Sequence, residues 1–277
     1  MVGICTGLAL SAGSNPLTVV TVRTLCVILL LIAYFRMAGV SIAMSRRDRL
    51  IAIQIGFLLS LTTYLLNSAI AEIPVPLAVL IFYLWPALTT CASWALGKER
   101  FRWRLLFGLL LAFAGIGLSL NVDFSAAQWK GVALAVGSSL AWSATFLLTG
   151  HFFHARDTRP ATFTMVLTMA AVFAVLCAIT GAVALPSTAA GWTALASMPV
   201  FYAFALIGLF AATVTLGAAK SGFYMNFEPI ASVLLAVPIL GQRLAPVQLA
   251  GGALVVAALF LFRPLRTDSG PARSYRR

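Results

Sequence analysis

The sequence has little charge, and acidic residues are especially scarce. Only 9% of the 277 residues are charged, with seven Asp and Glu against 19 Lys and Arg. A typical soluble domain is about 25% charged. Because 61% of the residues are hydrophobic, a chain of this length could not cover its apolar surface in water. The composition excludes a soluble enzyme or a DNA-binding domain and indicates an integral membrane protein with room for about ten spans.

Clustered metal ligands and nucleotide-binding motifs are also lacking. The four cysteines stand singly in apolar runs, so neither a disulfide framework nor a zinc site is indicated. His151 and His154 are close in sequence but stand alone, and two ligands do not define a metal site. No Walker-type phosphate loop occurs, which excludes ATP hydrolysis as an energy source. We therefore expect no metal and no cofactor.

The apolar runs are long and continuous, which is typical of transmembrane helices rather than of barrel strands. Proline stands at or just before many run starts, where its missing N–H costs least. These prolines are Pro16, Pro76, Pro160, Pro199 and Pro246. The expected spans are residues 1–13, 17–36, 49–70, 77–97, 103–121, 130–150, 161–184, 200–219, 224–240 and 246–263. The first run is too short to cross a bilayer.

The basic residues predict the orientation. If ten spans alternate, most of them share one side, in loops 36–49, 98–104 and 156–159, at Lys220 and in the C-terminal tail. The opposite loops hold only Lys130 and Arg243. Since cytoplasmic loops are enriched in Lys and Arg, both termini are expected in the cytoplasm of a multi-pass inner-membrane protein. The net charge of +12 then reports orientation and contact with anionic lipid, and no nucleic-acid partner is expected.

An internal repeat appears when the segment that starts at Pro86 is aligned, without a gap, with the segment that starts at Pro229. Arg100, Gly108 and Leu111 then fall on Arg243, Gly251 and Leu254. Each half holds five expected spans, and because five is odd the second half enters the membrane upside down, an architecture of transporters. The sequence therefore predicts an all-α ten-helix bundle of two inverted five-helix repeats, residues 1–121 and 122–263, followed by a basic cytoplasmic tail, residues 264–277.

The repeat also bears on the short first span. The sixth span and its flanking loop extend from Trp129 to Pro160, whereas the corresponding segment before Pro16 is only about half as long. We therefore expect that the first helix lacks about half of its length, through a start codon placed too late or a shortened chain.

Two pairs of motifs resemble the signatures of the EamA-type drug/metabolite transporters. They are Tyr83-Leu84-Trp85-Pro86 with Gly97-Lys98-Glu99-Arg100, and Asn226-Phe227-Glu228-Pro229 with Gly241-Gln242-Arg243. The chain departs from the family pattern at the inserted Lys98, at Gln242 and in its short first helix. The resemblance implies ten helices, cytoplasmic termini, a cavity between the halves and export of small organic metabolites. The segment at 83–86 looks most like the aromatic amino acid exporters of the family.

Polar groups at membrane depth are costly and are therefore candidates for the transport site. Glu228 would be a cavity carboxylate that binds a cation or a coupling proton, or else an acid at a helix start. Arg23, within the second span, would bind a substrate carboxylate or extend to the membrane surface.

Further candidates come from the segments that line the cavity in the family. Tyr83, Trp85, Tyr224 and Asn226 would face the substrate, or else pack between helices or in an interfacial aromatic belt. Tyr64, Asn67 and Trp142, on the third and sixth spans, are additional candidates. Pro86 and Pro229 would start helices. The glycines of the fifth and tenth spans allow close helix approach, and in the family this pair of helices can support a homodimer.

The function expected from these observations is secondary export of a small metabolite such as an amino acid, by alternating access of the two repeats. Whether export is coupled to protons or facilitated stays open, because Glu228 is the one acid well placed to carry a proton. A membrane enzyme would need a clustered catalytic set, whereas the seven acids are scattered and both histidines lie in one loop. We therefore expect no enzyme. A scaffold without transport activity is the remaining alternative.

Overall fold

The computed structural model describes residues 2–37, 39, 41–73, 75–97, 102–119, 128–153, 157–228, 230–231 and 245–261. All regular structure within these ranges is α-helical. The helices are α1 (Val2–Ser11), α2 (Pro16–Met37), α3 (Arg46–Glu72), α4 (Val75–Phe82), α5 (Trp85–Ala95), α6 (Trp103–Ser119), α7 (Trp129–Phe152), α8 (Arg159–Thr180), α9 (Ala189–Leu216), α10 (Ala218–Met225) and α12 (Pro246–Leu261).

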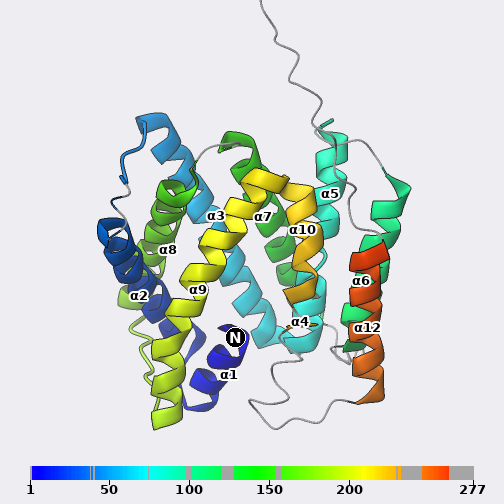
Figure 1. Cartoon of the computed structure of the whole chain (residues 1–277). Helices are drawn as coiled ribbons and strands as arrows, with labels where there is room; N and C mark the ends of the chain where they lie inside the picture. The colour runs from blue at the N-terminus through cyan, green and yellow to red at the C-terminus, as the bar shows by residue number, and fades with distance from the viewer. Residues whose placement is uncertain are drawn as a thin grey trace, which may run out of the picture.

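Six spans of the described chain are long and apolar enough to cross a membrane, counting Leu77–Ala95 as one, and α6 and α12 add shorter apolar helices. Figure 1 shows the helices running roughly side by side, with α6 beside α12 at one edge and α2 beside α8 at the other. The expected all-α membrane bundle is confirmed, and the chain is a multi-pass membrane protein.

Local sequence accounts for several helix ends. Ser45 caps α3 by accepting a hydrogen bond from the backbone N–H of Asp48, and Thr188 caps α9 by accepting one from Gly191. Such caps satisfy amide groups that have no partner within the helix. Helix α8 ends at Gly181, whose φ of 61° is a left-handed conformation that a glycine adopts without strain.

Expected helix boundaries are wrong in the fourth, eighth and ninth spans. The ninth was expected from residue 224, but α10 begins at Ala218. The sequence pattern predicts the eighth span from residue 200, with Pro199 at its start, but α9 begins at Ala189 and Pro199 lies inside it. Ending a helix at membrane depth would expose several backbone groups to lipid, whereas the internal proline removes one N–H. The fourth span, expected as one helix over residues 77–97, is divided into α4 and α5 by a turn at Tyr83 and Leu84.

The packing pairs elements of the two halves. Helix α3 packs against α7 and α1 packs against α9, while α2 contacts α8 and α6 contacts α12. When each helix is replaced by its counterpart in the other repeat, the contact of α3 with α7 becomes that of α9 with α1, and the other two contacts are unchanged. Two repeats related by a two-fold axis produce such a relation. Helix α1 has 10 residues and α7, its counterpart, has 24.

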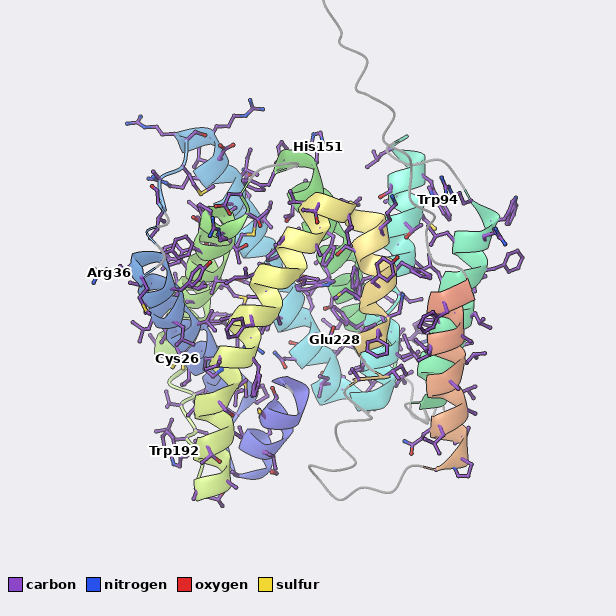
Figure 2. All side chains as sticks on the ribbon, viewed as in Figure 1. Cys26, Arg36, Trp94, His151, Trp192 and Glu228 are labelled. Carbon is purple, nitrogen blue, oxygen red and sulfur yellow. The ribbon has the colours of Figure 1, made fainter. Side chains whose placement is uncertain are left out.

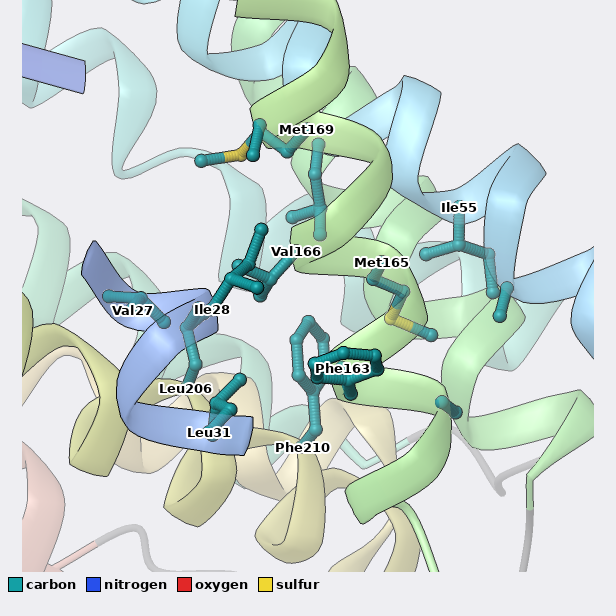
Figure 3. Packing of buried hydrophobic residues seen from close by; sticks show 14 of the residues in the cluster. Val27, Ile28, Leu31, Ile55, Phe163, Met165, Val166, Met169, Leu206 and Phe210 are labelled. Carbon is teal, nitrogen blue, oxygen red and sulfur yellow. The ribbon is translucent and has the colours of Figure 1, made fainter. Parts of the chain in front are cut away.

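The largest group of buried hydrophobic residues lies where α2, α3, α8 and α9 meet. Figure 3 shows part of it, with Val27 and Leu31 of α2, Val166 of α8, and Leu206 and Phe210 of α9. Because lipid tails are as apolar as these side chains, close packing rather than escape from water holds such helices together. This core places the inner faces of α2 and α9 beside a central cavity.

Candidate functional site

A cavity of about 710 Å³ lies between the halves of the bundle. Its volume is in the range of small-molecule sites. Helices α1, α2, α3, α7 and α9 contribute to its wall, together with the turn between α4 and α5 and the segment that follows α10. Most lining residues are apolar, and among the described ones two are charged, Arg23 and Glu228.

The turn between α4 and α5 places an aromatic group in this wall. The backbone N–H of Tyr83 still donates to Val79 at 2.9 Å, after which Pro86, the second residue of α5, supplies no N–H. Tyr83 and Trp85 are 8% and 2% exposed, and both line the cavity. The Trp85 ring packs edge-on against Trp142 of α7, with ring centroids 6.3 Å apart.

Glu228 faces the cavity from the other half of the chain. Figure 2 shows it within the bundle near the lower end of α10. Its side chain is exposed, lines the cavity and lies within hydrogen-bonding reach of the Tyr83 hydroxyl. A carboxylate from the second half therefore meets a phenol from the first half in the cavity wall.

Arg23 contributes the positive charge. Its guanidinium carbon lies 4.1 Å from the centre of the Tyr202 ring of α9, a cation–π contact. The Nε atom is buried and has no hydrogen-bond partner. The side chain is thus directed into the cavity wall rather than along its helix to the membrane surface.

Six sequence candidates are brought together around the cavity: Arg23, Asn67, Tyr83, Trp85, Trp142 and Glu228. Three others are not among its lining residues. Tyr64 is 55% exposed, Tyr224 is 40% exposed, and Asn226 is buried with its amide donating to the backbone oxygen of Phe223. Pro229 lies outside the described residues.

Sequence reasoning missed the contribution of α9. Phe201, Ala205, Gly208 and Ala212 line the cavity at spacings of three and four, which is one face of a helix, and Tyr202 lies beside them. All four lie within the expected span 200–219, but they are apolar, so a search for polar groups at membrane depth did not single them out. Within the described ranges no three His, Cys, Asp or Glu residues group as metal ligands, so those residues offer no metal-binding set.

A model of the EamA-like transporter family matches residues 1–121 and 129–263. The chain belongs to this family, within the drug/metabolite transporter superfamily. Members of the EamA-like family are transporters, and the chain is a transmembrane transporter of this type. A solved crystal structure, described simply as a protein, aligns with a TM-score of 0.73 and 22% identity over 92% of this chain and 91% of its own. That likeness supports the fold alone. No curated protein matches the chain.

Proposed function

We propose that this EamA-like transporter is a secondary transporter that exports a small organic metabolite by alternating access through the central cavity. The substrate class that we favour is an amino acid. The observation that carries the proposal is the composition of the cavity wall. It combines one side chain of each charge, Arg23 and Glu228, with aromatic side chains that include Trp85 and Trp142. An amino acid has a carboxylate and an ammonium group on an apolar body, and the aromatic rings favour a planar side chain.

The direction and setting of transport rest on sequence patterns. The resemblance at residues 83–86 to aromatic amino acid exporters implies export. The basic loops imply an inner-membrane protein with both termini in the cytoplasm. Consistent with this orientation, the end of α7 and the starts of α3 and α8, which carry His151, Arg46 and Arg159, lie toward one end of the bundle (Figure 1).

The test is counterflow of labelled phenylalanine in vesicles that contain the purified protein, compared with protein-free vesicles. We expect protein-dependent exchange of phenylalanine, and exchange of smaller amino acids at lower rates. Phenylalanine uptake no faster than in protein-free vesicles, with other amino acids equally inactive, would exclude amino acids as the substrate class.

Proton coupling and facilitated transport are separated by Glu228. In the coupled mechanism, an imposed pH gradient accelerates phenylalanine transport and Glu228→Gln abolishes this acceleration while leaving exchange measurable. Glu72→Gln is the matched control, because Glu72 lies at the end of α3 in a pair with Lys130 and outside the lining residues. If the pH gradient does not change the rate of phenylalanine transport by the wild type, the protein is instead a facilitator.

A further inference from the structure

Arg23 is a permanently charged side chain whose charge is not neutralised by the described part of the chain. Among the described residues its partner is the Tyr202 ring, and no ion pair joins it to Glu228, the charged residue that shares the cavity. The Nε atom lacks a hydrogen-bond partner. The side chain is half-buried in the cavity wall, and hydrogen bonds between a charged donor and an anion are among the strongest, so an anionic ligand in the cavity would gain from contact with this guanidinium.

Arg159 provides a comparison within the same protein, because its guanidinium is hydrogen-bonded to a carboxylate. Its Nε donates to both carboxylate oxygens of Asp157, at 2.9 and 3.0 Å, and its Nη2 donates to one of them at 2.7 Å. A carboxylate is the group that the planar guanidinium matches best. Arg23 presents the same group to the cavity, where the carboxylate among the described lining residues, that of Glu228, forms no ion pair with it.

The other side chains of the cavity wall restrict the chemistry of the uncharged part of the ligand. The Tyr202 ring lies against the Arg23 guanidinium in a cation–π contact, so an aromatic side chain borders the charged group. Phe82, Trp85 and Trp142 form an apolar aromatic surface, with the Trp142 centroid 6.1 Å from that of Phe82 and 6.3 Å from that of Trp85. Such rings suit a flat or apolar group.

We infer that Arg23 binds a substrate carboxylate and that the substrates are small organic acids with an apolar or aromatic body, amino acids being one case. This inference rests on the proposed function, because it names the chemical class that the cavity carries. It makes the carboxylate, rather than the amine, the group required for recognition.

The experiment uses inhibitors of phenylalanine counterflow in vesicles containing the full-length protein. The first probe, phenylpropionate, keeps the carboxylate and lacks the amine. The second, phenylethylamine, keeps the amine and lacks the carboxylate. In the third, phenylalaninamide, a neutral amide replaces the carboxylate. Charge-assisted hydrogen bonds are about twice as strong as neutral ones. We therefore expect phenylpropionate to inhibit at concentrations at least about tenfold lower than either other probe.

Variants then assign the effect to Arg23. Arg23→Gln should weaken inhibition by phenylpropionate at least about tenfold and leave inhibition by phenylethylamine unchanged. Arg23→Lys, which keeps the charge without the planar fork, should fall between. Arg36→Gln, at the exposed end of the same helix, is the matched control and should behave as wild type. If Arg23→Gln has too little counterflow to inhibit, quenching of tryptophan fluorescence by the same probes in detergent gives the same comparison.

The outcomes separate the two proposals. Phenylalanine counterflow with equal inhibition by the amine or the amide, or an unchanged response in Arg23→Gln, would overturn the inference and leave the transporter function standing. Lack of counterflow of phenylalanine and of other amino acids in the wild type, with no quenching by phenylpropionate, would remove both.

Discussion

At Gly56, α3 and α8 approach too closely for a side chain to fit between them. A β-carbon added at this position would lie 2.6 Å from the β-carbon of Thr168 and 2.8 Å from the backbone oxygen of Met165. Both atoms are fixed to the backbone of α8, so no side-chain rotation relieves the contact. Helix α3 belongs to the first half of the chain and α8 to the second. Gly56 therefore sets how closely the halves pack.

The expected cost of Gly56→Ala follows from these distances. Ordinary van der Waals contact begins at 3.4 Å, so α8 must move away by several tenths of an ångström. Overpacking a tight interior costs about 1–3 kcal/mol, whereas replacing glycine by alanine within a helix gains about 0.5–1 kcal/mol. We expect a net loss of about 1–2 kcal/mol in the free energy of unfolding.

Gly208→Ala is the matched control, because a β-carbon at Gly208 on α9 would meet nothing within 4 Å. Unfolding of both variants in mixed detergent micelles, followed by loss of helical circular dichroism, measures the difference. Gly56→Ala should unfold at a lower denaturant concentration than wild type, and Gly208→Ala at the same or a higher one. A Gly56→Ala protein as stable as the Gly208→Ala control would refute the reasoning from close packing.

Two further predictions concern ion pairs outside the cavity. Glu72 and Lys130 join the end of α3 to the start of α7. Lys130→Glu should therefore lower the melting temperature in detergent and the charge swap Glu72→Lys with Lys130→Glu should restore it, with smaller differences at high salt. A swap no better than the single variant would contradict the pairing. Hydrogen bonds from the Arg159 side chain hold the pKa of Asp157 below its ordinary value. The ionised carboxylate therefore stabilises the fold above about pH 4, and this contribution is lost as the pH falls through the lowered folded-state pKa. Asp157→Asn should flatten the decline of melting temperature below about pH 4, and a decline like that of the wild type would count against this assignment.

The membrane spans could be predicted from sequence because lipid imposes one rule, continuous apolar helix, on most of the chain. The errors arise where a local signal competes with that rule. Pro199 resembles a helix start, yet the cap at Thr188 begins α9 well before it. The turn after Phe82 leaves no mark on hydropathy, because the apolar run continues through it. Prolines and aromatic residues indicate that a helix is interrupted, but packing decides where.

The site was less predictable, because side-chain direction depends on local geometry. Asn226 caps the end of α10 and its amide donates to the backbone oxygen of Phe223, so of Asn226 and Glu228 only Glu228 lines the cavity. Tyr83 and Trp85 are also two apart, but the turn between α4 and α5 lets both line the cavity. Matching motifs in the two repeats therefore predicted the region of the site without predicting which of its side chains face inward.

The repeat and the charges have separate roles in the cavity. When the two repeats are aligned with Pro16 on Pro160 and Pro86 on Pro229, Arg23 corresponds to Leu167 and Glu228 corresponds to Trp85. Leu167 lies on α8 and is 46% exposed, and Trp85 belongs to the aromatic wall, so each charged lining residue has an apolar counterpart in the other repeat. The shared residues build two similar halves, as the proposed alternating access requires. The unshared charges make the two sides of the cavity wall chemically different, as the proposed recognition of a substrate with one acidic group and one apolar body requires. We therefore expect substitutions at Arg23 and Glu228 to change which solute is carried more than whether the bundle folds.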